Sequence, residues 1–350
     1  MRSPAPFPIK AGTVFFGVRL YPSDFLSTLM DARALRQAKA SKGWIGGYMG
    51  SIVILGVFVA DTSYRAKRMP QMGETLLGES FALGPGGKGS NQAVAAGRLG
   101  ADVTIISRLG RDDFGKMAEK IWQDAGVNPA ITYDADAYTG AAFVFVNSES
   151  GDNAIIIAPG AASDITPQII DDNSALISSA DVFMTQLEQP LDAAWAGLKL
   201  AKENGGITIL NPAPAAPLPD DIFTLCDYIT PNETEAEALT GLPVRTEAEA
   251  EHAAKALAQK GVTTPIITLG EQGAYLYKHG LVPAFDAGPV VETTGAGDAF
   301  NGALAIALAE GQPAHAAVLF GCATAALSVT RPGAASSMPT RSEVDALLPK

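Results

Sequence analysis

Cysteine and histidine are scarce in this sequence. Its 350 residues include 2 cysteines and 3 histidines. Neither Cys226 nor Cys322 has metal-ligating neighbours at the spacing of a zinc site, which argues against a disulfide framework and against a cysteine-based metal centre. We therefore expect a reducing, cytoplasmic setting. Cys322 lies in the apolar run FGCATAALSV, which predicts a buried side chain.

Positive charge is also in short supply. There are 25 lysines and arginines against 37 aspartates and glutamates, which gives a net charge of −12. Because contact with nucleic acid needs clustered basic residues, we expect no nucleic-acid partner. A small phosphorylated ligand is not excluded, since a metal ion and local dipoles can offset its charge. No apolar run reaches the roughly 20 residues of a membrane-spanning helix, so we expect no membrane partner either.

The first 48 residues are basic, unlike the acidic remainder of the chain. They contain Asp24 and Asp31 as their acids, and their basic residues are Arg2, Lys10, Arg19, Arg33, Arg36, Lys39 and Lys42. The stretch MGSIVILG, from Met49, is typical of a natural chain beginning. We therefore interpret residues 1–48 as an N-terminal extension that is weakly ordered and non-catalytic. A basic leader of this kind also fits a transit peptide.

Strand and helix signals alternate along the rest of the sequence. The apolar run SIVILGVFVAD (51–61) predicts one buried strand, and the alternation ends with two apolar helices at 297–310 and 313–328. This pattern predicts an α/β fold with a mostly parallel sheet and helices on both faces. Two β-rich segments, near 73–83 and 139–158, interrupt the rhythm. We expect them to pair into a small separate sheet that forms a lid or an interface.

A run of small residues precedes Asp298 in the stretch ETTGAGDAF. Gly295, Ala296 and Gly297 leave the backbone bare at the expected start of a helix, where unpaired N–H groups and the helix dipole attract an anion. Asp298 would then be a base that takes a proton from an attacking hydroxyl, while the N–H groups stabilise the transferred group. The alternative is an ordinary acidic residue in a first helical turn.

A second glycine-rich stretch, GGKGSNQA, also precedes an expected helix. Its Lys88 and Asn91 supply donors and an acceptor of the kind that a polyhydroxyl substrate needs. The spacing of a P-loop is absent. The alternative is a turn whose glycines only let a helix pack closely. We expect Lys88 and Asp298 to share a cavity. An Asp298 buried against the core, or one far from any cavity shared with the Lys88 loop, would contradict the kinase interpretation.

Two further stretches follow predicted strands. In PNETEAE, Asn232 and Glu235 combine an amide and a carboxylate, which suits a hydrated Mg²⁺, although helix capping explains the same spacing. The glycines of TLGEQGA (268–274) either hold a nucleotide or form a plain turn. Since ligands in open α/β sheets bind beyond the carboxyl ends of strands, all these stretches are expected at one edge of the sheet.

The stretches GGKGSNQAVAAGRLGADV and TTGAGDAFNGALAIAL resemble the two signatures of the PfkB carbohydrate kinase family, and of its ribokinases in particular. Between and after them, MTQLEQPL, LNPAPA, ITPNETEAEALTG, ITLGEQGA and VTRPGA stand in ribokinase order and spacing. The resemblance covers about residues 51–349. It implies a ribokinase-like three-layer sandwich over 49–350, with a small β-sheet lid formed by segments near 61–85 and 138–158.

The resemblance also implies an activity. It is ATP-dependent phosphorylation of a sugar hydroxymethyl group, ribose to ribose 5-phosphate in the type reaction, with Mg²⁺ and K⁺ as ions and a homodimer formed through the lid. Two alternatives are open. One is a PfkB kinase of another substrate, such as fructose, a ketodeoxy acid or a nucleoside. The other is a non-catalytic sugar or nucleotide sensor on the same fold.

Residue roles follow from the same resemblance, position by position. The base is Asp298, and the anion hole is Gly295, Ala296 and Gly297. The sugar-contacting positions are Asp61, Gly87, Lys88, Asn91 and Glu188. The ATP site takes in Asn232, Gly297, the loop from Thr268 through Gly270 to Gly273, and the neighbourhood of Cys322. The Mg²⁺-linked acid is Glu235. The surroundings of a monovalent cation are Glu292, Thr294, Ser328, Arg331, Gly333 and Ser337.

Two positions depart from the ribokinase pattern. Val59, in GVFVAD, stands where ribokinases usually have asparagine, and valine cannot hydrogen-bond a sugar hydroxyl. This favours a different pentose, a deoxy sugar or another polyol. Glu292 stands where aspartate is common, and the longer carboxylate makes K⁺ activation a weaker expectation.

Overall fold

Buried β-branched strands form the centre of the molecule. A computed structural model describes residues 50–349, so the predicted extension, residues 1–48, lies outside the described residues. One sheet has the strand order β13-β12-β11-β10-β9-β8-β1-β4-β5. In it β12 is antiparallel to β11 and β13, and all other neighbours are parallel. The strands are β1 (Ser51–Leu55), β4 (Asp102–Gly110), β5 (Asn128–Asp134), β8 (Val182–Thr185), β9 (Ile207–Leu210), β10 (Tyr228–Ile229), β11 (Thr264–Thr268), β12 (Gly273–Leu276) and β13 (Gly280–Pro283).

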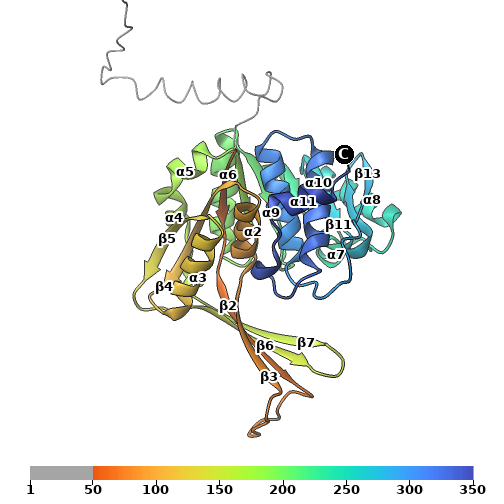
Figure 1. Ribbon diagram of the computed structural model, residues 1–350. Coiled ribbons are helices and arrows are strands. Elements are labelled where there is room, and N and C mark those ends of the chain that lie inside the picture. The colour runs from red at the N-terminus through yellow and green to blue at the C-terminus, as the bar shows by residue number, and fades with distance from the viewer. Residues whose placement is uncertain (1–49, 350) are drawn as a thin grey trace, which may run out of the picture. The chain divides into compact units, whose positions relative to one another are not determined.

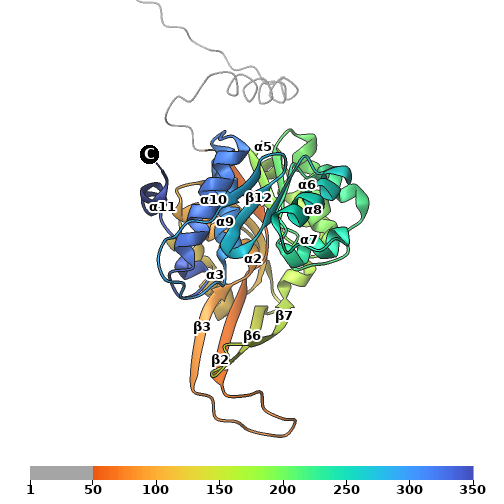
Figure 2. The same ribbon diagram turned by 90° about the vertical axis from the view of Figure 1, so that its right-hand side faces the viewer.

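Helices cover both faces of this sheet, as Figure 2 shows. Strand β1 illustrates why, because its side chains alternate: Ile52 and Ile54 belong to one buried apolar cluster and Val53 and Leu55 to another. The helices of the first face are α2 (Lys88–Arg98), α3 (Asp113–Asp124), α9 (Ala296–Ala309), α10 (Ala314–Ser328) and α11 (Arg341–Leu347). Those of the second are α4 (Pro167–Asp172), α5 (Ser174–Ser179), α6 (Leu191–Glu203), α7 (Glu233–Thr240) and α8 (Glu247–Gln259). Short 3₁₀ turns are η1 (Ala161–Asp164), η2 (Asp220–Leu225), η3 (Gly270–Gln272) and η4 (Ala335–Ser337).

Four other strands form a separate small sheet in the order β3-β2-β6-β7. Figure 1 shows it projecting from the body that the large sheet and its helices form. Its strands are β2 (Val59–Ala66), β3 (Ser80–Gly86), β6 (Thr139–Asn147) and β7 (Asn153–Gly160). Both fold expectations, the mostly parallel sheet between helices and the small separate sheet, are therefore confirmed.

The single strand predicted over 51–61 was wrong. The run breaks after Leu55, and β2 begins at Val59 in the other sheet. The reason is a close backbone approach: a Cβ on Gly56 would lie 2.6 Å from Cα of Gly89 in α2. Because the chain has to pass the start of this helix there, one apolar run supplies strands to both sheets.

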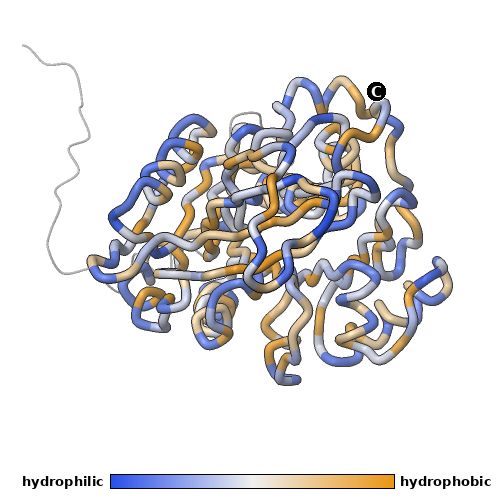
Figure 3. Tube along the Cα trace, turned by 90° about the horizontal axis from the view of Figure 1, so that it is seen from below, coloured by the Kyte–Doolittle hydropathy of each residue, from blue (hydrophilic) through white to orange (hydrophobic). Residues whose placement is uncertain are grey.

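The two sides of the small sheet differ. Strand pairing places Tyr64, Phe81, Leu83 and Ile156 on one side, and all four are exposed. We call these four residues the apolar face of the small sheet. Asp61 points to the other side, on which Ile155 and Ile157 are also exposed. Hydrophobic and hydrophilic segments alternate along the chain trace, as Figure 3 shows.

Within residues 50–349, no helix combines the length and apolar character that crossing a membrane requires.

Candidate active site

The start of α2 requires glycine. Gly87, the residue before the helix, has φ of 88°, which is a left-handed conformation that favours glycine. A Cβ at this position would lie 2.5 Å from the carbonyl oxygen of Val57. This tight fit places the backbone of Lys88 directly beside the beginning of β2.

Two carboxylates lie against this glycine loop. A Cβ on Gly86 would lie 2.2 Å from Oδ2 of Asp61. The backbone N–H of Lys88 donates to Oε2 of Glu188, in the loop after β8, over 2.7 Å. Burial raises the pKa of Asp61 to about 6. Burial also raises the pKa of Glu188 to about 7, against the opposing effects of the Lys88 N–H and ammonium group.

Asp298 lies in the first turn of α9, after Gly295, whose φ is 82°. Its carboxylate is buried but not isolated. Nδ2 of Asn91 donates to Oδ2 over 2.9 Å, and Nε2 of Gln92 donates to Oδ1 over 3.1 Å. Burial raises the pKa of Asp298, whereas the charge of Lys88 and these two amide donors lower it. The glycine-rich start of α2 and the acid of α9 therefore form one polar cluster.

Lys88 is the positive charge of this cluster. Its ammonium group lowers the pKa of Glu188, Asp298 and Glu235, each of which burial raises. These acids come from the loop after β8, from α9 and from α7. Three acids that surround one lysine attract further cations and hydroxyl donors more than they attract a bare anion.

Asn232 and Glu235 form a capping box at the start of α7. Oδ1 of Asn232 accepts from the N–H of Glu235 over 2.8 Å, and Oε2 of Glu235 accepts from the N–H of Asn232 over 2.9 Å. The capping alternative is therefore what these side chains do here. Electrostatic interaction of Glu235 with Lys88 and Asp298 nevertheless places its carboxylate near the cluster.

The loop from Thr268 to Gly273 is a turn between β11 and β12. The N–H of Thr268 donates to the carbonyl of Pro231, next to the capping box, over 3.0 Å. Gly270 has φ of 52°, and a Cβ there would lie 3.9 Å from Oε1 of Glu233. Close packing requires glycine at position 273, since a Cβ there would lie 2.2 Å from the carbonyl oxygen of Val282.

The residues predicted to surround a monovalent cation lie on two segments that hydrogen bonds hold together. Oε2 of Glu292 accepts from the N–H of Gly333 over 2.8 Å. Next to it, the N–H of Val291 donates to the carbonyl of Val329 over 2.8 Å. The hydroxyls of Ser328 and Ser337 donate to carbonyls of their own segments, both over 2.8 Å.

Two predicted residues of these regions have other partners. The guanidinium of Arg331 is paired with Glu343 of α11 at 2.6 Å. Cys322 is buried in the apolar cluster of α9 and α10, as predicted for its apolar run, with its thiol 3.9 Å from the carbonyl of Val282. None of these contacts connects the side chain of Arg331 or Cys322 to Asp298.

Comparison with known protein families shows the family to which the chain belongs. Residues 49–341 match the family described as pfkB family carbohydrate kinase. The chain belongs to this family. Membership makes the protein a phosphotransferase that acts on an alcohol group of a sugar, so the expected activity class is confirmed and the sensor alternative is set aside.

Within this family, the kinase is similar to ribokinases and to a deoxyribokinase. A ribokinase of Haemophilus influenzae is 41% identical over 297 residues, which are 84% of this chain and 96% of that protein. A deoxyribokinase of Salmonella typhi is 36% identical over 294 residues, 83% of this chain and 95% of that protein. The solved structure of Arabidopsis thaliana ribokinase complexed with ribose and ATP has a TM-score of 0.82 and 32% identity, and covers 86% of this chain and 99% of that one.

Sequence reasoning missed the buried amides of the kinase. Gln92, Gln186, Asn211 and Asn301 are nearly or fully buried around Asp298. A partial signal was present, because Asn211 in LNPAPA and Asn301 in FNGALAIAL are single amides among apolar or small residues. Asp298 is more buried than a residue lining an open cavity would be. Its hydrogen bond to Asn91 shows that it is not buried away from the Lys88 loop.

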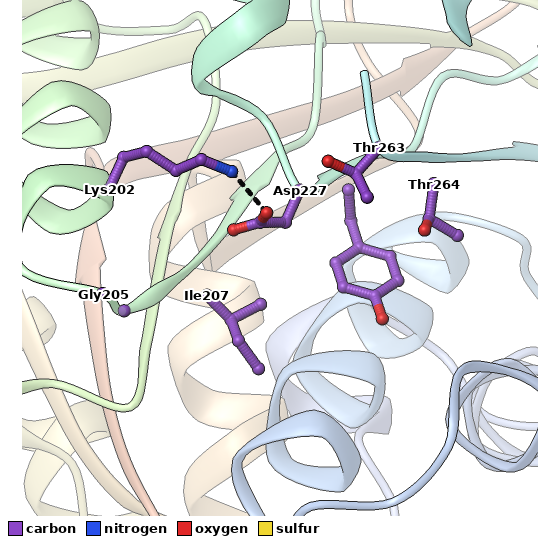
Figure 4. A pocket seen from close by; sticks show the side chains of 8 residues that line it. Lys202, Gly205, Ile207, Asp227, Thr263 and Thr264 are labelled. Atoms are coloured by element: carbon purple, nitrogen blue, oxygen red, sulfur yellow. Dashed lines mark hydrogen bonds and ion pairs between the residues drawn. The ribbon is translucent and has the colours of Figure 1, made fainter. Parts of the chain in front are cut away.

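A surface pocket of about 380 Å³ lies elsewhere in the kinase (Figure 4). Its lining includes Ile207, Tyr228 and Thr264, which are the first residues of β9, β10 and β11. Lys202 and Asp227 form an ion pair at its wall. Because it is at the amino ends of these strands, it lies at the edge opposite to the predicted site residues, and it contains none of them.

Proposed function

We propose that this kinase transfers the γ-phosphoryl group of ATP to the hydroxymethyl group of ribose and forms ribose 5-phosphate. The observation that carries the proposal is the hydrogen-bonded cluster of Asp298 with Asn91 at the start of α2. The ribokinases of Haemophilus influenzae and Arabidopsis thaliana support ribose as the acceptor, and ATP, named with the latter, supports the donor.

The transfer uses groups of this chain for positioning and charge. Asp298 accepts the proton of the sugar hydroxyl as the oxygen attacks the γ-phosphorus and the bond to the ADP oxygen breaks. The N–H groups of Gly295, Ala296 and Gly297 would stabilise the charge on the transferred phosphoryl, and that of Ala296 would exchange its present bond to the carbonyl of Thr293 for this one. The hydroxyls of the sugar are held by the side chains or backbone of Asp61, Gly87, Lys88, Asn91 and Glu188. We further propose that Asn232, Thr268, Gly270, Gly273 and the surroundings of Cys322 bound the ATP site.

Mg²⁺ bound with the nucleotide would neutralise charge on the phosphates. The donor set near Glu235 fits a hydrated ion rather than a protein cage. Its Oε2 is engaged with the N–H of Asn232, and no group of three or more His, Cys, Asp or Glu side chains suited to a metal occurs among residues 50–349. Mg²⁺ keeps several waters and binds phosphates, so one nearby carboxylate is sufficient. Glu235 would hold these waters.

A monovalent cation, K⁺, fits between the two segments that Glu292 and Gly333 connect. The hydroxyls of Ser328 and Ser337 donate to the carbonyls of Ala325 and Ala334, so backbone oxygens would be the main ligands. Thr294 and the backbone of Arg331 would contribute in the same way. Glu292, longer than the usual aspartate, would hold the two segments together rather than add a tight ligand.

The small sheet is proposed as a lid over the sugar and as the interface of a homodimer. The side of the sheet that carries Asp61 would cover the sugar and exclude water. The apolar face of the small sheet would meet a second copy, because exposed apolar patches mark protein interfaces. A cytoplasmic location completes the proposal.

A second candidate substrate is 2-deoxyribose. Val59 is only 6% exposed, begins β2 opposite Gly86 and belongs to an apolar cluster, so it offers no hydrogen bond at this position. A sugar that lacks the hydroxyl facing Val59 loses no hydrogen bond at this position. The 36% identity to deoxyribokinase is compatible with this candidate.

The test is ADP release from ATP and Mg²⁺ with ribose, 2-deoxyribose, fructose and a nucleoside as separate acceptors. The highest kcat/KM for ribose supports the proposal, and the highest value for 2-deoxyribose supports the second candidate. No acceptor-dependent ADP release with either pentose would contradict both. Repeating the assay with Na⁺ in place of K⁺ tests the cation.

A further inference from the structure

Gln92 is the most connected side chain around Asp298. It is fully buried in α2. Its Nε2 lies 3.1 Å from Oδ1 of Asp298 and 3.1 Å from Oδ1 of Asn211, and its Oε1 accepts from Nε2 of Gln186 over 2.5 Å. An amide nitrogen has two hydrogens, so both donated bonds can exist at once.

The hydrogen bonds continue until they return to α9. Nδ2 of Asn211 donates to the carbonyl of Thr230 over 3.1 Å. The hydroxyl of Thr230 donates to Oδ1 of Asn301 over 2.7 Å, and Nδ2 of Asn301 donates to the carbonyl of Gly297 over 2.8 Å. Gly297 is bonded covalently to Asp298. These contacts form a closed ring, which we call the amide ring: Asp298, Gln92, Asn211, Thr230, Asn301 and Gly297.

The donors in the ring are consistent with one another. Because Gln186 donates to Oε1 of Gln92, the NH₂ group of Gln92 has to face Asp298. Reversing the Gln92 amide would set its oxygen against the carboxylate of Asp298 and against Oδ1 of Asn211. The neighbouring donor, Asn91, has no such constraint, since its buried Oδ1 has no hydrogen-bond partner. Of the two amides that hold the carboxylate, Gln92 is therefore the one that is itself held.

We propose that Gln92 is a positioning residue for the phosphoryl transfer, because it fixes Oδ1 of Asp298 and, through the amide ring, fixes the carboxylate relative to the backbone of Gly297. The inference rests on the proposed function, since it takes Asp298 as the base. Gln92 itself touches neither substrate. With Oδ1 held by Gln92, Oδ2, which accepts from Nδ2 of Asn91, is the oxygen that takes the proton.

Other charged groups around Asp298 do not change when Gln92 is replaced. Lys88 lowers the pKa of Asp298, and the carboxylates of Glu188 and Glu235 interact with Asp298 from the loop after β8 and from α7. A change in the pKa of Asp298 on replacing Gln92 therefore reports the lost amide donor. Removing a donor to a charged carboxylate raises the pKa of that carboxylate.

The test is Gln92→Met, which keeps the length of the side chain and removes its polar atoms. We expect kcat for ADP release to fall about 10- to 100-fold, and the KM for the sugar to stay within about threefold, because an orienting group for the base is lost and the sugar contacts are kept. The acidic limb of the kcat profile should move to higher pH by about one unit, which corresponds to one hydrogen bond to a charged group.

Ser90→Ala is the matched control. Ser90 is fully buried two positions away on α2, and its hydroxyl accepts from Nε1 of Trp122 over 2.9 Å, on the side of α3. This control removes a buried hydrogen bond from the same helix, so it should lower the melting temperature and leave the acidic limb unchanged. The inference would be overturned if the acidic limb of the kcat profile shifts no further in Gln92→Met than in Ser90→Ala.

A direct titration separates this inference from the proposed function. The ¹³C resonance of the Asp298 carboxyl, assigned with Asp298→Asn, should titrate at a higher pH in substrate-free Gln92→Met than in the wild type. Loss of turnover in Asp298→Asn together with identical titrations would refute the role of Gln92 and keep Asp298 as the base. Retained turnover in Asp298→Asn would refute the proposed function itself. If Gln92→Met does not fold, Gln92→Glu is the second variant, because its carboxylate can still accept from Gln186. We expect it to move the acidic limb of the kcat profile to a still higher pH. An acidic limb at the wild-type pH in that variant would also overturn the inference.

Discussion

Asn91 and Asp298 are 207 positions apart in the sequence, and their side chains are joined by a hydrogen bond of 2.9 Å. The bond connects the first turns of α2 and α9, which pack side by side on one face of the large sheet. The two glycine-rich helix starts are thus parts of one structure. In the proposed function, a sugar held by the first would lie beside the acid of the second.

Asp298→Asn should abolish turnover. An asparagine keeps the size of the side chain but cannot take a proton at neutral pH, and a general base commonly contributes at least about 100-fold to the rate. We expect kcat for ADP release to fall by that factor or more. Sugar binding, measured by calorimetry, should stay within about threefold. Turnover at near wild-type rate would remove Asp298 from the role of base.

Val59→Asn should change the preference between two sugars. An asparagine at the start of β2 would supply a hydrogen bond to a hydroxyl that 2-deoxyribose lacks. We expect the ratio of kcat/KM for ribose to that for 2-deoxyribose to rise about tenfold, the value of one net hydrogen bond. The unliganded protein should melt at a lower temperature, because the new amide is buried in an apolar cluster.

Val59→Leu is the control for the change of size alone. It should leave the ratio of the two sugars unchanged. An equal ratio in Val59→Asn and the wild type would mean that this position does not face the sugar hydroxyl.

The fold was largely predictable from local patterns. Alternating strand and helix signals predict the sheet and its two helical layers, because central strands such as β1 are buried on both sides and helices such as α3 bury one face. What failed was the run 51–61. Gly56 stands at the break, but a single glycine in an apolar run does not by itself indicate a change of sheet. The break depends on the contact of Gly56 with Gly89, and such a contact between distant residues has no local signal.

The structure brings Asn91 and Asp298, two of the predicted site residues, together, but the sequence did not predict the network of buried amides beside them. Glycines before helices and lone charged residues pointed to Lys88, Asn91 and Asp298. The amides Gln92 and Asn211 gave only a weak signal, since a buried amide is recognisable from sequence only when its partners are known. The capping box of Asn232 and Glu235 shows the converse limit, because the same spacing serves helix capping and metal binding.

Glu188 should make stability depend on pH in the substrate-free kinase. Its pKa in the folded protein is about 7, above the ordinary 4.5, because burial disfavours the charged form. The folded state therefore binds this proton more tightly than the unfolded state does, and the associated stability is present at acidic pH and lost as pH rises through about 7. Glu188→Gln cannot titrate, so the free energy of unfolding of the wild type should fall relative to it with rising pH.

The slope of that difference should reach at most ~1.4 kcal/mol per pH unit, the value for one proton. Denaturant titrations of both proteins between about pH 5 and 8 measure it. Asp61→Asn should show the same sign over a lower window, because the pKa of Asp61 is about 6. A constant difference between wild type and Glu188→Gln across this range would contradict the prediction.

Gly87 and Gly100 flank α2 and allow a matched test of the tight turn. Their φ angles are 88° and 89°, but a Cβ on Gly100 meets open space, whereas one on Gly87 lies 2.5 Å from the carbonyl of Val57. Gly100→Ala should cost only the backbone strain, about 1–2 kcal/mol. Gly87→Ala should cost more and raise the KM for the sugar, since the loop has to move. Equal losses of unfolding free energy would show that the contact with Val57 relaxes freely.

Ile156 and Ile155 allow the same kind of comparison for the proposed dimer. They are neighbours on β7, 65% and 54% exposed, but pairing places Ile156 on the apolar face of the small sheet and Ile155 on the side of Asp61. A lysine buried in an interface is costly. Ile156→Lys should therefore be monomeric in light scattering after size exclusion, and Ile155→Lys should stay dimeric. The same mass for both variants would show that the apolar face is not the surface on which two copies meet.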